Sequence, residues 1–385
     1  MAGRNFLFVP GPTNIPDRVM RAMMVSMEDH RSPAFPALTH EIMPGLKKLF
    51  RTEHGTPFVF PSSGTGCWEA AVTNTLSPGD RVLAARFGQF SHLWIDMCTR
   101  IGLDVQIVDC EWGTGVPLQQ FADILKSDTQ HQFKAVLACH NETATGVTSD
   151  IAGVREALDD AAHPALLFVD CVSSLGCIDF RFDEWGVDLA VGCTYKYGNS
   201  GPGSPAWLYV NKSIQSQVLP TIQGWFANDK QFEMGPFFEP AENIRRFQIA
   251  SPSIMGIRAM QASYSMIEEA GMKAISQKAA LGTELILALY DAWLAPLGFS
   301  LLTPRDHNKR GGHITVGHPD AKKIAAAMRS MTNTIPDYRT PDSIRLAIAP
   351  LPTSYTEVFD GLQRMRDLVA SKKYLEIQDN GSRVT

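Results

Sequence analysis

The sequence has neither a basic excess nor a long apolar run. Charged residues make up 19% of its 385 residues, and the formal net charge is −5. A surface for nucleic acid or anionic lipid needs an excess of Lys and Arg, and no apolar stretch approaches the length of a membrane span. The N-terminus, MAGRNFLFVPGPTNIP, lacks the basic and then apolar pattern of a signal peptide. We therefore expect a soluble, cytoplasmic protein that binds neither nucleic acid nor membranes.

Cysteine is sparse and shows neither a ligand pattern nor a redox pattern. All seven cysteines lie between Cys67 and Cys193, without a CxxC pair or histidines at zinc-site spacing. The histidines are scattered, and His307, His313 and His318 have no carboxylate or cysteine partner at ligand spacing. We expect reduced, mostly buried cysteines and no metal site.

Short apolar runs alternate with helix-like stretches through the first half of the chain. The hydrophobic content of 44% allows one large core and a smaller one. Strands are predicted at 57–60, 81–85, 104–108, 134–139, 165–169, 187–192 and 205–210, and helices at 66–76, 91–102, 117–127 and 151–161. This alternation predicts an α/β domain with a large, doubly wound, mostly parallel sheet.

The pattern changes near residue 250. A long amphipathic helix is predicted over 256–292, in two pieces around Gly271, and is followed by strands at 299–302, 312–316 and 343–348 and helices at 320–330 and 354–371. The predicted organisation is an N-terminal arm (1–15), a large domain (16–255) and a small C-terminal α+β domain (256–385). The sequence shows no internal repeat and no low-complexity tract.

A lysine between two tyrosines follows the sixth predicted strand, in the stretch GCTYKYGNSGPGSPAWLYV (192–210). One interpretation is an ordinary surface lysine at the end of a strand. The apolar lead-in, the neighbouring Tyr195 and Tyr197 and the glycine-rich loop favour another interpretation. When a lysine loses hydration, its charged form is disfavoured, and the neutral amine of Lys196 could then form a Schiff base.

Asp170 follows the apolar strand ALLFV and precedes small residues that include Ser173. Ligands of parallel sheets bind at the carboxyl ends of the strands, where this carboxylate is expected. If the ligand is pyridoxal phosphate, an Asp there pairs with the protonated pyridine nitrogen. Alternatively, Asp170 caps the turn that follows. We also expect Ser173 to contact the cofactor.

Other strand ends carry further candidates. The segment PSSGTGCWEAA (61–71) places Ser63, Gly64 and Thr65 where a helix begins, and such a start can hold a phosphate, although many α/β proteins use it simply to turn. Phe90 could stack on a planar ring or belong to the core. The segment HNETATG (140–146) offers Asn141 and Thr143 as polar contacts.

Together these segments resemble a class V, fold type I pyridoxal-phosphate enzyme. Residues 1–190 resemble serine–glyoxylate and alanine–glyoxylate aminotransferases, through FVPGPTNIP (8–16), EDHRSPAFPALT (28–39), FPSSGTGCWEAAVTNTLSPGD (60–80) and HNETATGVTSDIAGVR (140–155). From about residue 190 the chain resembles kynureninase, through GWFANDKQFEM (224–234), FEPAENIRRFQIASPSI (238–254) and PDYRTPDSIRLAIAPLPTSYTEV (336–358). The chain is therefore expected to be a mosaic of two class V patterns.

The resemblance implies a role for each candidate residue. The aminotransferase-like part assigns Gly64 and Thr65 to the cofactor phosphate, Phe90 to ring stacking, Thr143 to the hydroxyl side of the ring and Asp170 to the pyridine nitrogen. The kynureninase-like part assigns Lys196 to the Schiff base, Tyr195 to the phosphate and to acid/base chemistry, and Arg345 to the substrate α-carboxylate. It also implies that Trp225 and Ser251 contact the phosphate across the interface of a homodimer.

The two resemblances imply different reactions. We favour amino transfer from serine, alanine or aspartate to a small 2-oxo acid such as glyoxylate, because PGPTN (10–14) and HRSP (30–33) resemble segments that line a small substrate pocket. The alternative is kynureninase-like hydrolysis of the Cβ–Cγ bond of kynurenine to alanine and anthranilate. Other pyridoxal-phosphate chemistry, or cofactor binding with little catalysis, also remains open.

Overall fold

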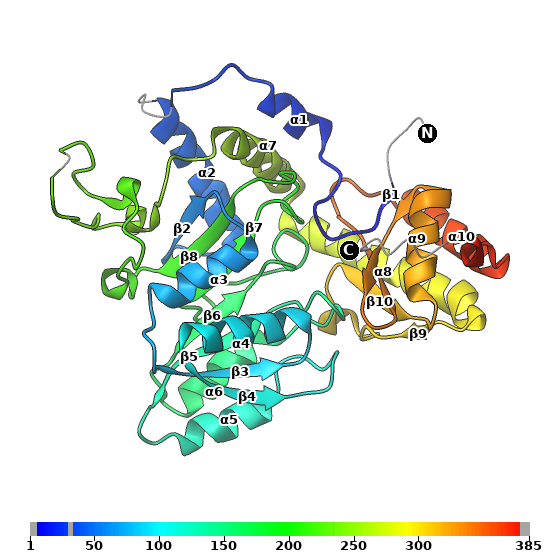
Figure 1. Cartoon of the computed structure of the whole chain (residues 1–385), viewed down its shortest axis with the longest axis horizontal. Helices are drawn as coiled ribbons and strands as arrows, with labels where there is room; N and C mark the ends of the chain where they lie inside the picture. The colour runs from blue at the N-terminus through cyan, green and yellow to red at the C-terminus, as the bar shows by residue number, and fades with distance from the viewer. Residues whose placement is uncertain (1–5, 30–33, 234, 378–385) are drawn as a thin grey trace.

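A seven-stranded sheet forms the centre of the larger of two lobes in the computed structural model (Figure 1). The structure describes residues 6–29, 34–233 and 235–377, apart from the side chains of 34–40 and 60. The strand order is β2-β8-β7-β6-β5-β3-β4, and all strands run in one direction except β8, which is antiparallel to both of its neighbours. The strands are β2 (Gly55–Phe60), β3 (Arg81–Arg86), β4 (Asp104–Asp109), β5 (Phe133–Cys139), β6 (Leu166–Asp170), β7 (Leu189–Cys193) and β8 (Ala206–Asn211).

Helices cover both faces of this sheet, as the predicted doubly wound fold requires. One core lies between the sheet and α2 (Ala34–Phe50), α5 (Leu118–Ser127), α6 (Ile151–Asp160) and α7 (Ile254–Ala270). A second core lies under α3 (Gly64–Thr73) and α4 (Gln89–Ile101) on the opposite face. The central strands β5, β6 and β7 are buried on both faces and read as apolar runs, and the sequence predicted all seven strands to within two residues at either end.

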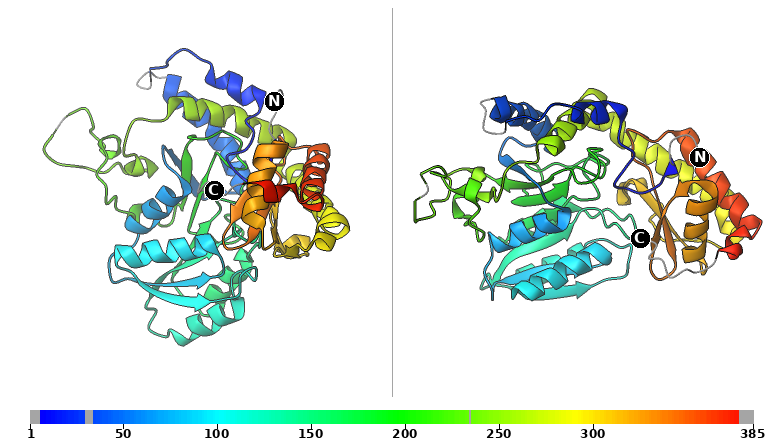
Figure 2. Two further views of the ribbon diagram at one scale, coloured as in Figure 1. Left: turned by 45° about the vertical axis from the view of Figure 1, so that its right-hand side comes forward. Right: turned by 45° about the horizontal axis from the view of Figure 1, so that its top comes forward.

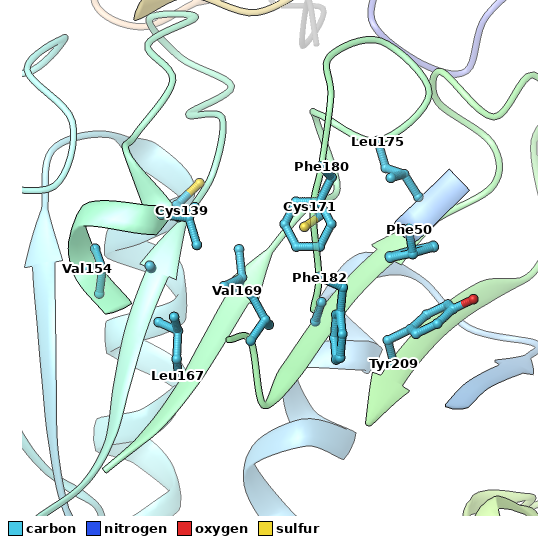
Figure 3. Packing of buried hydrophobic residues seen from close by; sticks show 14 of the residues in the cluster. Phe50, Cys139, Val154, Leu167, Val169, Cys171, Leu175, Phe180, Phe182 and Tyr209 are labelled. Atoms are coloured by element: carbon cyan, nitrogen blue, oxygen red, sulfur yellow. The ribbon is translucent and has the colours of Figure 1, made fainter. Parts of the chain in front are cut away.

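Aromatic side chains fill the first core near the β8 side of the sheet. Figure 3 shows Phe50, Phe180, Phe182 and Tyr209 gathered there, beside Cys171 at the end of β6. Phe50 stacks on Tyr209 with ring centroids 3.8 Å apart and meets Phe180 edge-on at 5.9 Å. These contacts hold helix α2 and the 171–182 segment, which begins next to Asp170, against the sheet.

The C-terminal third forms the smaller lobe, which both views of Figure 2 show beside the large sheet. Its antiparallel sheet has the order β12-β13-β10-β9. The elements are α8 (Met272–Leu289), β9 (Ser300–Leu301), β10 (His313–Gly317), α9 (Ala321–Thr332), β11 (Thr334–Ile335), β12 (Asp337–Arg339), β13 (Ser343–Ala347) and α10 (Tyr355–Ala370). The predicted break at Gly271 is confirmed, since this residue, with φ of +77°, separates α7 from α8.

Short elements escaped the sequence analysis. Strands β11 and β12 have two and three residues, too few to show a period. The N-terminal arm also contributes to the small lobe, because β1 (Phe6–Leu7) pairs with β11 and Phe8 lies in the small-lobe core. Helix α1 (Asp17–Met23) packs instead against α7. The domain boundaries at 15 and 255 stay predictions.

One helical segment, Met272–Leu297, is long and apolar enough by length and composition to cross a membrane. The sequence analysis expected no such segment. Its side chains Ile286, Leu287, Tyr290 and Leu294 lie in the core of the small lobe, an arrangement typical of a core helix.

Candidate active site

The carboxyl ends of neighbouring parallel strands bring the predicted site residues together. Asp170 is the last residue of β6, the middle strand of the sheet, and Thr143 follows β5. Phe90 lies in the first turn of α4, after β3. Lys196 was expected at the end of its strand, but β7 ends at Cys193, and Lys196 lies in the turn that follows. This turn carries the amine over the end of β6.

The amine of Lys196 joins a hydrogen-bonded chain. Its Nζ donates to Ser173 Oγ at 2.8 Å, and Ser173 Oγ lies 2.5 Å from Thr143 Oγ1. The same Nζ lies 5.5 Å from the centre of the Phe90 ring. Burial lowers the pKa of Lys196, and the nearby positive charge of Arg345 lowers it too, although Cys193 and Asp170 act in the opposite direction. The neutral, nucleophilic form of this amine is therefore easier to reach than in a solvent-exposed lysine.

Asp170 is a buried carboxylate, 4% exposed, held by two donors. Trp68 Nε1 donates to its Oδ2 at 3.2 Å, and the backbone N–H of Val172 donates to its Oδ1 at 2.7 Å. Burial raises the pKa of Asp170 from 3.8 to about 6, against the effect of these donors and of Lys196. A buried carboxylate of this kind is suited to a cationic partner.

The start of helix α3 forms a polar end of the site. Ser63 caps the helix by accepting the backbone N–H of Gly66 at 3.3 Å, and Thr65 is exposed. Gly64 N–H donates to the Tyr195 hydroxyl at 3.3 Å, which ties this helix start to the turn that bears Lys196. A side chain at Gly64 would collide with Val172, because an added Cβ would lie 2.6 Å from its Cγ2. Exposed N–H groups at a helix start attract phosphate.

Arg345 reaches the site from the small lobe. Its Nη1 donates to the backbone oxygen of Thr143 at 3.0 Å and to Thr143 Oγ1 at 3.1 Å. Its Nε and Nη2 both bond to Asp337 across the β12–β13 ladder. Arg345 thereby links the two lobes at the residue that also contacts Ser173.

Three other residues singled out in the sequence, Trp225, Ser251 and Asn141, lie in loop segments. Trp225 and Ser251 belong to the segment between β8 and α7, which Figure 1 shows extending away from the sheet on the β2 side. Trp225 is 40% exposed, and its Nε1 donates to the backbone oxygen of Gln231. Asn141 uses its amide within its own loop, donating to the backbone oxygens of Gly146 and Val147. The HRSP segment (30–33) lies outside the described residues.

Glu142 is a site residue that the sequence analysis missed. Its fully buried carboxylate accepts the backbone N–H groups of Phe90, Ser91 and Ala144, at 3.2, 3.0 and 3.2 Å. It therefore fixes both the helix start that presents Phe90 and the loop that presents Thr143. A carboxylate within HNETATG, among small and uncharged residues, was the available signal.

The N-terminal arm covers Lys196 directly. A side chain at Gly11 would collide with it, because an added Cβ would lie 2.4 Å from Lys196 Cγ. Thr13 Oγ1 bonds to Asn199 Oδ1 at 3.1 Å and approaches the backbone oxygen of Lys196 at 3.5 Å. Gly11 and Thr13 of PGPTN therefore pack directly on the lysine turn, and their contribution to a substrate pocket stays a prediction.

Comparison with solved structures defines the class of fold. A ureidoglycine–glyoxylate aminotransferase from Bacillus subtilis superposes with a TM-score of 0.82 at 21% identity, covering 99% of this chain and 96% of that one. The fold is therefore that of the fold type I pyridoxal-phosphate enzymes, with the large sheet and the small C-terminal lobe in the expected arrangement.

Sequence comparison adds the family. The L-aspartate–glyoxylate aminotransferase of Paracoccus denitrificans is 45% identical over 293 residues, 76% of this chain and 72% of that protein. The serine–glyoxylate aminotransferase of Methylorubrum extorquens is 61% identical over 194 residues, but the chain spans only about half of that relative, 48% of its length. This chain belongs to the class V glyoxylate aminotransferase family of pyridoxal-phosphate enzymes.

The mosaic character is also shown. The family model of the kynureninase C-terminal domain matches residues 275–365. The kynureninase of Geobacillus thermodenitrificans is 38% identical over 221 residues, 56% of this chain and 51% of that protein. The chain therefore combines glyoxylate aminotransferase and kynureninase patterns, as its two halves predicted.

The residues present fit pyridoxal phosphate. The amine of the half-buried Lys196 suits the aldehyde, the buried carboxylate of Asp170 suits the pyridine nitrogen, and the start of α3 suits the phosphate. Among the residues that the structure describes, no three His, Cys, Asp or Glu side chains are grouped to hold a metal ion. The seven cysteines are free, and all except Cys110 are buried.

Proposed function

We propose that the protein transfers the amino group of serine, alanine or aspartate to a small 2-oxo acid such as glyoxylate. The observation that carries the proposal is the packing of Gly11 and Thr13 against the stem and backbone of Lys196, from which we infer a narrow pocket at its amine. A narrow pocket favours small substrates over an aryl ketone. The relatives named as aspartate–glyoxylate and serine–glyoxylate aminotransferases support the same class of small amino acid and oxo acid substrates.

Each residue of the site would have a defined task in this reaction. When bound, pyridoxal phosphate supplies an aldehyde that condenses with amines and a ring that accepts electrons from the substrate α-carbon. Lys196 would remove the proton from the substrate α-carbon and deliver it to the carbon that was the cofactor's aldehyde, while Asp170 would keep a proton on the pyridine nitrogen. Phe90 would pack on the ring, and Arg345 would orient the α-carboxylate through its planar fork.

The polar chain at Lys196 would support these proton movements. Ser173 receives a hydrogen bond from the amine and contacts Thr143, whose side chain also accepts from Arg345. The position of the base is thereby coupled to the position of the carboxylate-binding arginine. At the phosphate end we assign Ser63, Gly64, Thr65 and Tyr195 to the cofactor, because Tyr195 and the α3 start are already in contact.

Kynureninase-like hydrolysis is the second candidate. Tyr195 contacts Gly64 at the helix start that we assign to the phosphate, and the resemblance to kynureninase expects a phenol there, which supports this candidate. Burial raises the pKa of Tyr195, so the phenol keeps its proton at neutral pH and can donate it. The match of residues 275–365 to the kynureninase C-terminal domain supports this candidate independently.

A single-turnover experiment separates the two reactions. The cofactor-loaded protein is mixed in turn with serine, alanine, aspartate and kynurenine, without an oxo acid, while its visible absorbance is recorded. An aminotransferase loses this absorbance with a small amino acid and regains it only when glyoxylate is added. Release of fluorescent anthranilate from kynurenine, with the absorbance returning unaided, contradicts our proposal and establishes the second candidate.

We further infer a cytoplasmic homodimer whose sites are completed by the partner chain. The segment between β8 and α7 exposes large apolar side chains: Leu219, Ile222, Trp225, Phe232, Phe237 and Ile249. An exposed apolar segment of this kind is typical of an interface. Trp225 and Ser251 lie on it and would reach the phosphate of the partner's site. Light scattering tests the assembly, and a fully active monomer would refute it.

A further inference from the structure

Arg339 ends strand β12 on the same face of the small sheet as the site arginine. In the β12–β13 ladder Asp337 lies opposite Arg345, and Arg339 lies opposite Ser343. Side chains two residues apart on a strand share a face. Arg339 therefore points to the side from which Arg345 reaches Thr143.

The two arginines share one carboxylate unequally. Arg345 bonds to Asp337 Oδ2 through Nε and Nη2 and uses Nη1 on Thr143. Arg339 only approaches the same oxygen, with its Nη2 at 3.6 Å. Its Nε is buried and has no hydrogen-bond partner within the described part of the chain. Asp337 thus satisfies Arg345 and leaves Arg339 with capacity for another anion.

Arg339 also lies within electrostatic range of the reactive amine. Its positive charge lowers the pKa of Lys196, as that of Arg345 does. Burial, together with the charge of Arg345, lowers the pKa of Arg339 itself to about 10, so this side chain is still a cation at neutral pH. The side chain is 31% exposed, which leaves it accessible to a ligand that enters the site.

We propose that Arg339 binds the side-chain carboxylate of the amino donor, which makes a short dicarboxylic amino acid of the aspartate class the preferred donor. The assignment rests on the aminotransferase function proposed above. Arg345, anchored on Thr143, takes the α-carboxylate, and Arg339 on the neighbouring strand takes the second one. Its guanidinium matches a carboxylate in shape and charge.

Serine and alanine cannot provide this second anion. A site that is built to pair with a substrate group discriminates against analogues that lack the group, because its own polar atoms then stay unpaired. With serine or alanine bound, the buried Nε of Arg339 has no partner. The structure therefore separates the three donors that the sequence left equivalent.

The test uses the cofactor-loaded variants Arg339→Gln and Arg339→Lys. A matched control is Arg305→Gln, since Arg305 belongs to the same lobe but forms an exposed ion pair with Asp291. With glyoxylate as acceptor, Arg339→Gln should lower kcat/KM for aspartate by about 10- to 100-fold and leave the value for serine within about twofold. Arg339→Lys should fall between, because it keeps the charge and loses the fork. Equal losses with both donors, or no loss with aspartate, would overturn the assignment.

A binding measurement keeps this result separate from the proposed function. Calorimetry gives the Kd of the same proteins for succinate and for propionate, which bind without turnover. Arg339→Gln should weaken succinate binding about 10-fold and leave propionate unchanged. Wild-type protein that fails to transaminate but binds succinate through Arg339 would refute the function and not the carboxylate site. If the protein transaminates but Arg339→Gln leaves its succinate affinity unchanged, the carboxylate site is refuted and the proposed function is not.

Discussion

The candidate site residues fall into two groups that differ in how they are assembled. Lys196, Ser173 and Thr143 form a hydrogen-bonded chain at the edge of a buried sheet, with Arg345 joined to it from the small lobe. Trp225 and Ser251 lie on a segment that extends away from the sheet (Figure 1). The first group is joined by hydrogen bonds within one chain, whereas Trp225 bonds to Gln231 of its own segment.

The difference indicates which site residues are positioned when a single chain folds. Contacts at the sheet edge depend on the buried cores on both sides of β6 and β7, so the amine and the carboxylate are positioned by folding alone. The exposed apolar side chains of the segment between β8 and α7 lie outside these cores, although Val218 and Phe247 of the same segment belong to the core under α3. We therefore expect the chemistry to depend on the folded chain alone and the retention of the phosphate to depend on assembly.

The largest effect that would test this comparison is that of Lys196→Ala. We expect the rate of amino transfer to fall by roughly 10⁴-fold, because both the base and the covalent anchor are lost. The absorbance of a lysine-bound cofactor should disappear as well. A borohydride-reducible bond between this variant and the cofactor would mean that another residue carries the reaction.

Arg345→Ala should raise KM for every α-carboxylate substrate, on the order of 10- to 100-fold. Its removal also leaves the buried carboxylate of Asp337 without its closest partner, which costs about 3 kcal/mol or more of folding stability. Kinetics should therefore be measured together with thermal unfolding. The double variant Arg345→Ala/Asp337→Ala serves as a control, because it removes the unpaired charge. An unchanged KM would assign the carboxylate to another group.

Trp225→Ala should weaken cofactor binding by about 10-fold, the typical loss for a large aromatic contact at an interface. Co-expression with Lys196→Ala decides whether the contact crosses the interface. In a mixed dimer, the intact Trp225 of the Lys196→Ala chain would complete the site that still has Lys196, and the affinity of that site should return to the wild-type value. Absence of recovery would place Trp225 in its own chain's site and remove the contrast between the two groups.

The smallest effect concerns the stability of the cofactor-free protein. Because the pKa of Asp170 rises from 3.8 to about 6 on folding, the folded state binds more protons than the unfolded state between these values. The stability contributed by this group is complete below pH 3.8 and is lost as pH rises to about 6. The total loss is on the order of 3 kcal/mol.

Denaturant unfolding at a series of pH values measures this effect. Asp170→Asn should lack this part of the pH dependence and should be more stable than the wild type near pH 7. Parallel stability curves for the two proteins between pH 4 and pH 7 would show that burial does not control this carboxylate. Adding the cofactor should reverse the order, since only the carboxylate pairs with the pyridinium.

The sequence was sufficient for features that depend on local pattern. The apolar runs that became β5, β6 and β7 marked the sheet, and Asp170 and Thr143 followed directly, because whatever comes after a central parallel strand lies at its carboxyl edge. Gly271 marked the break between α7 and α8, because glycine readily adopts the positive φ that interrupts the helix there. The resemblance to the family was likewise identified from segments of consecutive residues.

The tertiary structure decided what depends on residues that are far apart in the chain. Arg345 and Thr143 are 202 residues apart, and nothing in either neighbourhood predicted their contact. Glu142 tied Phe90 to the Thr143 loop across 52 residues. The sequence did not distinguish Arg339 from the other arginines. The β12–β13 register places it on the same face as Arg345, and its buried Nε has no hydrogen-bond partner among the described residues. Local periodicity records which face of an element is buried, whereas the pairing of charges is set only when separate elements pack together.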